Sequence, residues 1–158
     1  MSIDIGLNTQ QREGLVEILN QLLADEFTLY TKTRKSHWNI FGKDFYSLHQ
    51  LFESQYEQLA EVVDSVAERI RVLGSFTIGT LEEFKSKTEI IERPGVYEKQ
   101  EQLIQDLLSD HEIIIRFLRA KIIETDQKFK DAGTTDFLTG IIQIHEKTSW
   151  ILRVQLEK

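Results

Sequence analysis

The chain has 158 residues, of which 41% are hydrophobic, 28% are charged and none is cysteine. Its 26 acidic and 19 basic side chains give a net charge of −7, which disfavours binding to nucleic-acid phosphates and favours attraction of cations. Without cysteine the chain cannot form disulfides or thiolate metal sites, so any metal ligands must be oxygen or nitrogen atoms.

No stretch approaches the ~20 apolar residues that span a bilayer, and residues 1–8 lack a basic segment followed by an apolar one. We therefore expect a single domain over residues 1–158, with no membrane segment, located in the cytoplasm.

Apolar residues recur at three- and four-residue spacing and predict long helices. The first covers residues 9–38 and is capped by Asn8 or Thr9. The second follows a short turn, covers residues 45–73, and ends where Gly74 can adopt a left-handed conformation.

Residues 75–95 form a long connection with several helix breakers. Within it, Thr80 and Glu83 resemble a capping box for a short helix at 81–86. Two further helices are predicted, at 96–129 and 135–156.

This order of elements predicts an all-α fold: a ferritin-like four-helix bundle with a short extra helix in the crossover between the second and third helices. A di-iron site inside such a bundle normally uses a Glu-x-x-His motif, which the sequence lacks. His111 and His145 have acidic neighbours, but adjacent helical residues point about 100° apart and do not readily chelate one ion. The sequence therefore disfavours a di-iron site within one chain.

The second helix carries four metal-ligand-type residues in a mirror-symmetric arrangement about Gln58 and Leu59: His49, Glu53, Asp64 and Glu68. All four lie within a stripe of roughly 100° on one helix face, yet His49 and Glu68 are about 28 Å apart along the axis. One ion cannot use both ends of one copy. An antiparallel second copy would bring His49 to the partner's Glu68, and Glu53 to the partner's Asp64, which predicts two equivalent sites between chains.

Two other interpretations of these residues remain open. An acidic pair four residues apart is usually a solvated surface feature, although Asp64 and Glu68 repel each other unless a cation relieves them. The mirrored residues could also be polar packing of an antiparallel dimer that binds no metal.

The chain resembles the Dps family, the DNA-binding proteins from starved cells, also called mini-ferritins. The resemblance rests on Lys35, Ser36, His37, Trp38, Asn39, Gly42, Phe45, Leu48, His49, Phe52, Asp64, Ala67, Glu68, Arg69, Leu73 and Gly74, and on the closing segment His145–Trp150. Together with the order of the helices, it extends over essentially the whole chain.

The resemblance implies a ferroxidase that oxidises Fe(II), preferably with hydrogen peroxide, and stores ferric mineral in a hollow homo-dodecamer. The site would hold two iron ions at a two-fold interface. Its implied ligands are His37, His49 and Glu53 from one subunit, with Asp64 and Glu68 from the neighbour. Many relatives have aspartate where this chain has Glu53. Zinc or manganese could occupy the same ligands.

The resemblance also implies roles outside the ligand set. Trp38 resembles the tryptophan that lies near the site and intercepts oxidising equivalents, with interface packing as its alternative role. Three aspartates resemble residues that line the pores through which iron enters the shell: Asp126, Asp131 and Asp136. Taken alone, they are turn and cap residues.

DNA binding is not expected, despite the family name. Residues 1–8 contain no basic side chain, and after Trp150 only Arg153 and Lys158 are basic. With a net charge of −7 on every chain, a shell would bind phosphates weakly unless cations bridged them. A DNA-compacting shell with secondary iron chemistry remains the alternative function.

Overall fold

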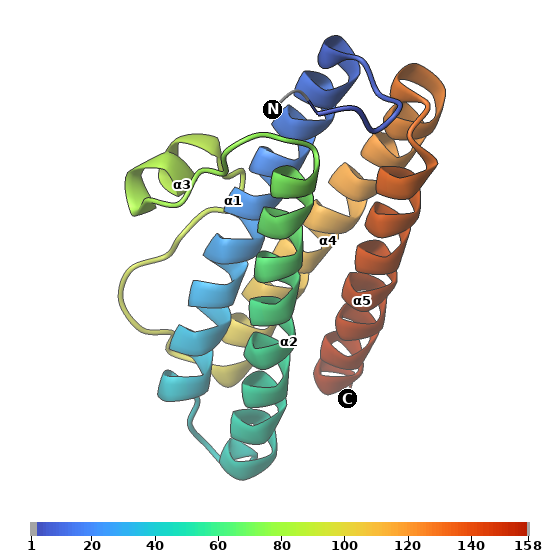
Figure 1. Cartoon of the computed structure of the whole chain (residues 1–158). Coiled ribbons are helices and arrows are strands. Elements are labelled where there is room, and N and C mark those ends of the chain that lie inside the picture. The colour runs from blue at the N-terminus through green and yellow to red at the C-terminus, as the bar shows by residue number, and fades with distance from the viewer. Residues whose placement is uncertain (1–2, 158) are drawn as a thin grey trace.

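The computed structural model describes residues 3–157, which contain five α-helices and one π-helical turn. The four long helices are α1 (Thr9–Asn39), α2 (Phe45–Val72), α4 (Gln100–Glu124) and α5 (Ala132–Leu156). α1 and α2 form one antiparallel hairpin, α4 and α5 form the other, and the hairpins pack together as a bundle (Figure 1). The predicted all-α four-helix bundle is confirmed.

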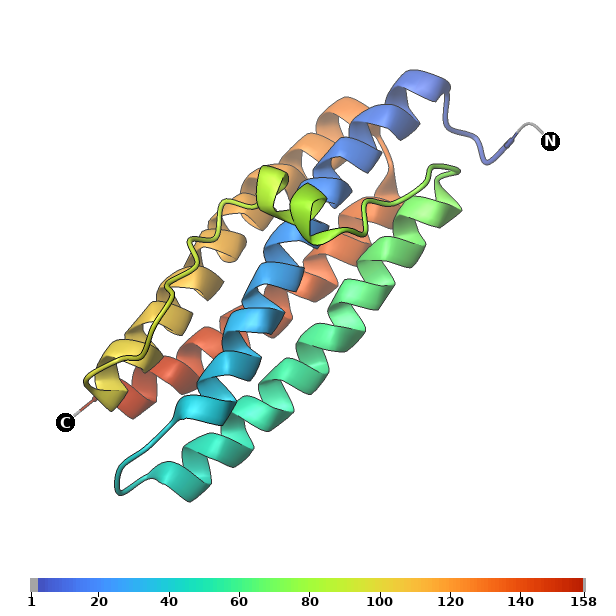
Figure 2. The same ribbon diagram turned by 90° about the vertical axis from the view of Figure 1, so that its left-hand side faces the viewer.

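The connection from α2 to α4 runs along the length of the bundle and contains the short helix α3 (Leu81–Lys87), which packs on α1 (Figure 2). α3 begins with the predicted capping box, in which Thr80 and Glu83 each accept a hydrogen bond from the other's backbone. Gly74 ends α2 with φ +90°, the left-handed conformation expected from the sequence.

The apolar faces of the four long helices meet in one core. Fully buried side chains from α1, α2, α4 and α5 contribute to it: Leu19, Leu22, Phe52, Val66, Ile114 and Leu138. Truncation of a buried aromatic such as Phe52 to alanine costs about 3–5 kcal/mol in proteins of this kind. No helix within residues 3–157 is long and apolar enough to cross a membrane.

The predicted start of the third long helix at residue 96 is wrong, because α4 begins at Gln100. The Tyr97 hydroxyl donates to Asp106, nine residues further on. In one helix these residues would lie on opposite sides and about 13 Å apart along the axis, so their contact requires an extended chain before α4. Burial and this hydrogen bond to Asp106 raise the pKa of Tyr97.

The predicted helix to residue 129 does not continue as one α-helix. α4 ends at Glu124 and is followed by the π-helical turn η1 (Thr125–Phe129). The buried Phe129 ring lies over Gly14 of α1, where a Cβ would come within 2.3 Å of the ring. α5 begins at Ala132, earlier than predicted, because Asp131 caps its first turn by accepting from the Gly133 N–H at 3.1 Å.

Three ionisable side chains meet inside the bundle without contact with solvent. Oε1 of Glu26 lies 2.8 Å from Nε2 of His145, and Nδ1 of His145 lies 2.8 Å from Nδ1 of His111. Burial lowers the pKa of His111 well below its ordinary value, and the neighbouring His145 adds to the effect. These contacts tie α1, α4 and α5 together at their centre.

Polar side chains of α1 also hold the crossover segment. Asp25 accepts hydrogen bonds from the Thr88 hydroxyl and the Glu89 N–H, at 2.8 and 2.7 Å. Lys32 donates to the Ile91 carbonyl at 2.8 Å and pairs with two carboxylates of α4, Asp106 and Asp110. Burial raises the pKa of both Asp25 and Asp110 to about 6.

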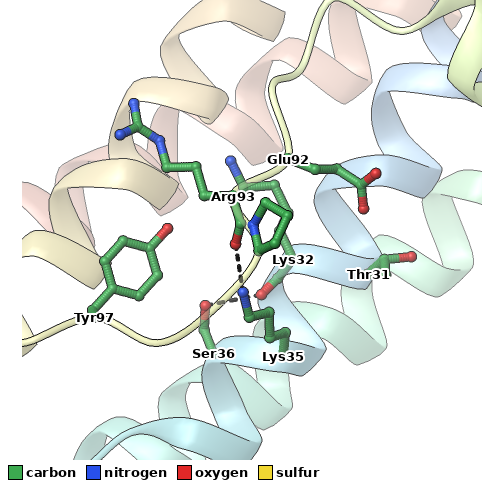
Figure 3. A pocket seen from close by; sticks show the side chains of 8 residues that line it. Thr31, Lys32, Lys35, Ser36, Glu92, Arg93 and Tyr97 are labelled. Carbon is green, nitrogen blue, oxygen red and sulfur yellow. Dashed lines mark hydrogen bonds between the residues drawn. The ribbon is translucent and has the colours of Figure 1, made fainter.

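Further contacts hold the next residues of the crossover over a cavity of about 290 Å³ (Figure 3). Lys35 donates to the Arg93 carbonyl at 2.5 Å, and the Arg93 guanidinium lies 2.8 Å from Asp106. Since Asp106 and Asp110 neutralise Lys32 and Arg93, the positive charges around this cavity are largely compensated.

Candidate metal centre

The two histidines of the predicted ligand set come together where α1 and α2 join. The rings of His37 and His49 stack with centroids 3.7 Å apart and an angle of 19° between their planes. His37 lies at the C-terminal end of α1 and His49 in the second turn of α2, so the short turn at residues 40–44 brings them side by side. His37 is 7% exposed and His49 is partly buried.

Reciprocal hydrogen bonds orient both rings. Nδ1 of His37 lies 2.8 Å from the carbonyl oxygen of His49, and Nδ1 of His49 lies 2.9 Å from the carbonyl oxygen of His37. A carbonyl only accepts, so each Nδ1 carries the proton. Each Nε2 of a neutral ring therefore keeps its lone pair, and the hydrogen bonds found for these two rings within residues 3–157 use Nδ1 alone. Metal-binding histidines are commonly oriented in this way.

Aromatic rings and one arginine surround the histidine pair. The Tyr56 ring meets the His37 ring edge-on at 5.2 Å, and the Phe45 ring stacks on His49 at 5.0 Å. The Arg34 guanidinium lies 4.8 Å from the Tyr56 ring centre and 5.4 Å from that of Trp38. Partial burial raises the pKa of Tyr56, and the negative charge of Glu53 adds to the shift. Trp38 follows His37 in the chain and shares the Arg34 guanidinium with Tyr56, and its role near the site stays a prediction.

The three predicted carboxylate ligands, Glu53, Asp64 and Glu68, are exposed on the outer face of α2. Glu53 is one turn from His49, whereas Asp64 and Glu68 lie in the last turns of the helix, far from both histidines. Within residues 3–157, no three His, Asp or Glu side chains are grouped so that they could hold a metal ion. One copy of the chain therefore brings together His37 and His49 but not the whole predicted set.

Four aromatic side chains are exposed at the end of the bundle that carries the histidines. They lie within nine residues of each other around the turn between α1 and α2: Trp38, Phe41, Phe45 and Tyr46, exposed by 64%, 45%, 43% and 71%. We call these four side chains the aromatic patch. Clustered exposed apolar side chains of this kind mark interaction surfaces more often than single ones do.

The three predicted pore aspartates lie near the junction of η1 and α5. Asp126 and Asp136 are exposed. Asp131 is more enclosed, because its carboxylate accepts from the Gly133 N–H, the Thr134 hydroxyl and the Arg69 guanidinium. The pore role of all three aspartates stays a prediction.

Sequence reasoning missed the contact between Glu26, His145 and His111. The acidic sequence neighbours of His111 and His145 are not the partners of these histidines in the fold, and no motif surrounds Glu26. The signal was their place in the apolar stripes: Glu26 lies among Leu22, Leu23 and Leu29, where a carboxylate requires a polar partner.

The sequence matches the Ferritin-like domain family over residues 16–158. A relative from Nostoc sp., an uncharacterized low temperature-induced protein, is 43% identical over 98% of this chain and 87% of its own length. The solved structure of DpsC from Streptomyces coelicolor superposes with a TM-score of 0.96, at 28% identity, over 100% of this chain and 92% of that one.

The solved structure of a Dps protein from Vibrio cholerae O1 superposes with a TM-score of 0.91, at 31% identity, over 99% of this chain and 98% of that one. That protein is described as a member of a broad superfamily of ferritin-like diiron-carboxylate proteins. The match to the Ferritin-like domain and the near-complete superposition on two Dps proteins show that the chain belongs to the Dps proteins of the ferritin-like family.

Proposed function

We propose that the protein is a ferroxidase and iron-storage shell that oxidises Fe(II), preferably with hydrogen peroxide, and so protects the cell from oxidative damage. Two copies form each site: His37, His49 and Glu53 of one chain face the partner's Asp64 and the partner's Glu68. Twelve copies enclose the cavity that stores the ferric product. The description of the Vibrio cholerae relative as a diiron-carboxylate protein supports iron as the metal.

The observation that carries the proposal is the reciprocal hydrogen bonding of His37 and His49. Two imidazoles with fixed tautomers and Nε2 lone pairs suit Fe(II), and carboxylates suit both Fe(II) and Fe(III). In one copy of the chain, too few carboxylates lie close to the two histidines. The mirrored arrangement of Glu53, Asp64 and Glu68 on the exposed face of α2 allows a second copy to supply them.

The aromatic patch supports the intersubunit arrangement. It adjoins the histidine pair, with the Phe45 ring stacked on His49, so a copy that approaches the histidines also covers apolar surface. Burial of aromatic side chains stabilises interfaces. Burial of the aromatic patch would offset the electrostatic repulsion between the acidic α2 faces of the two copies. Cations bound between these faces would remove the repulsion.

The chemistry requires two electrons for each peroxide. Each of two Fe(II) ions gives up one electron, the O–O bond of hydrogen peroxide breaks, and two protons complete two molecules of water. Two ions held by one site supply both electrons together, so no hydroxyl radical is released. The residues bind and orient the ions, and the partner's chain excludes bulk water from them.

Iron access and storage are further parts of this proposal. Asp126, Asp131 and Asp136 line pores whose negative charge concentrates cations. Zinc or manganese competes for the same ligands and slows oxidation when added in excess.

Stopped-flow oxidation of Fe(II), with peroxide and with dioxygen, combined with native mass measurement, tests the proposal. The D64N/E68Q variant is expected to lose at least 100-fold in peroxide-dependent rate while it still assembles. The matched control, E13Q/E101Q, removes two charges from exposed side chains of α1 and α4 outside the proposed site and is expected to keep the rate within about twofold. Equal rates in both variants, a monomeric wild type, or indifference to peroxide would contradict the proposal.

A further inference from the structure

Arg69, in the last turn of α2, binds the turn that begins α5. Its Nη2 lies 3.2 Å from Oδ2 of Asp131 and 3.0 Å from Oγ1 of Thr134, and its Nε donates to the same hydroxyl at 3.2 Å. The side chains of Arg69 and Asp131 are only 23% and 12% exposed, so solvent screens their attraction incompletely. One planar guanidinium thus connects the end of α2 to α5.

The two side chains that accept hydrogen bonds from Arg69 are held in place by further hydrogen bonds. Oδ1 of Asp131 accepts the Gly133 N–H at 3.1 Å, and the Thr134 hydroxyl donates to Oδ2 of Asp131. Gly133 also leaves the space that the guanidinium occupies, since a Cβ there would lie 2.9 Å from Nη2 of Arg69. The first turn of α5 therefore forms a rigid receptor for this side chain.

The neighbouring contact between α2 and α5 is loose. A groove of about 400 Å³ separates these helices along the turns that precede Arg69. It is lined by Gln58, Glu61, Ser65, Asp136, Gly140 and Ile144, among others. Packing along the groove therefore restrains the rotation of α2 weakly, and the three hydrogen bonds of Arg69 supply the restraint at its C-terminal end.

We propose that Arg69 is a positioning residue for the metal centre: its contacts with Asp131 and Thr134 fix the last turns of α2 so that Glu68 points at the partner's histidines. This inference rests on the proposed function, because Glu68 acts as a ligand only there. Adjacent helical residues point about 100° apart, so an Arg69 anchored on α5 holds Glu68 toward the outside of the bundle.

The tolerance of metal sites makes this restraint important. A rotation of α2 by about 15° would displace a carboxylate about 6 Å from the helix axis by roughly 1.5 Å. Metal–ligand distances must be correct to about 0.2 Å. Small rotational freedom at the end of α2 would therefore weaken iron binding even with every ligand present. The contacts also give Asp131 a role within the chain, besides the pore role predicted for it.

The R69Q variant of the full-length chain tests the inference against R116Q. Arg116 is an exposed residue of α4, so R116Q removes the same charge and leaves α2 and the contacts of Arg69 intact. For R69Q we expect kcat/KM for Fe(II) to fall at least 10-fold, mainly through a higher KM, with native mass unchanged. The absorption spectrum of Co(II) added to the iron-free shell should change in R69Q and stay as in the wild type in R116Q.

Two more variants complete the test. D131N should reproduce most of the R69Q effect, and the R69Q/D131N double variant should be little worse than either, because both remove one connection. If R69Q does not assemble, R69K carries the test, since lysine keeps the charge but cannot make the forked contact. Equal kcat/KM and Co(II) spectra in R69Q and R116Q would overturn the inference but not the proposed function. A wild type that does not oxidise Fe(II) would remove the proposed function and this inference with it.

Discussion

Hydrogen bonding at single residues decides which nitrogen of each histidine is available. His37 and His49 lie at the junction of α1 and α2 with Nδ1 bound to backbone carbonyls, whereas His145 uses both ring nitrogens inside the bundle. His111 differs again, because its Nε2 is buried and has no partner among the described residues. The four histidines of the chain therefore form two pairs: one leaves its Nε2 lone pairs for the proposed metal site, and the other joins helices.

Buried His111 makes folding depend on pH. Its pKa is lowered in the folded chain, so below about pH 6.5 the unfolded chain binds a proton at His111 that the folded chain does not. This contribution to stability is present above pH 6.5 and is lost as the pH falls. One such group contributes a slope of at most about 1.4 kcal/mol per pH unit.

Urea unfolding between pH 7.5 and pH 5 of the wild type and H111Q checks this expectation. Glutamine can still donate to Nδ1 of His145 but does not titrate, so the stability of H111Q should fall less steeply toward pH 5. Asp25 and Asp110, whose pKa is raised, act in the opposite direction in both proteins and cancel in the comparison. Parallel pH dependences would contradict the assignment to His111.

At the scale of elements, the crossover segment depends on α1 for its position. Asp25 holds its beginning through Thr88 and Glu89, and Lys32 holds the Ile91 carbonyl. These contacts come from side chains buried on α1, so loss of one exposes the crossover without dismantling a long helix.

Substitution of Asp25 tests how the crossover is held. In D25A the Glu89 N–H and the Thr88 hydroxyl lose their acceptor, which should cost about 1–3 kcal/mol of unfolding free energy and increase amide hydrogen exchange in residues 88–91. D25N keeps an acceptor oxygen and should exchange like the wild type in this segment. Equal exchange in D25A and the wild type would show that other contacts suffice.

Element boundaries could be predicted from the sequence where the residues that set them lie close by in the chain. The capping box of Thr80 and Glu83, and Gly74 at the end of α2, lie within one turn of what they determine, and both were predicted correctly. The start of α4 depends on Tyr97 reaching Asp106, and η1 places Phe129 over Gly14 of another helix. Helical periodicity continues through both places, so the sequence alone did not reveal them.

The same distinction between contacts within one helix and contacts between helices applies to the candidate site. The shared face of His49, Glu53, Asp64 and Glu68 follows from helical geometry and could be predicted from spacing. The stacking of His37 on His49 requires the register between α1 and α2, which spacing within one helix does not contain. Resemblance to a family indicated His37, but the reciprocal hydrogen bonds became visible only in the fold.

At the scale of the whole molecule, the proposed function depends on assembly. The mirror point of the ligand stripe lies near Gln58 and Leu59, but Leu59 is only 2% exposed and belongs to the core of its own chain. A substitution there would damage the bundle itself. Exposed Ala60 lies within the stripe, close to its midpoint, and is small enough for two helices to approach each other.

Introducing a large charged side chain at Ala60 tests the need for the second copy. In A60R the chain should fold with an unchanged helical content, yet lose the dimer and at least 10-fold in Fe(II) oxidation, although every ligand is intact. S54R is the control, because exposed Ser54 lies on α2 away from the ligand stripe. Sedimentation velocity and stopped-flow rates report the two effects, and full activity of a monomeric A60R would refute an intersubunit site.

The reciprocal bonds between His37 and His49 also bear on the thermodynamics of the proposed metal binding. Freezing two imidazole rotors costs conformational entropy, and here the α1–α2 hairpin bears that cost when it folds. Binding of an ion by these side chains then costs less conformational entropy. The acceptors are peptide carbonyls, which have no protonation equilibrium near neutral pH, so the orientation of both rings persists while carboxylates elsewhere gain or lose protons.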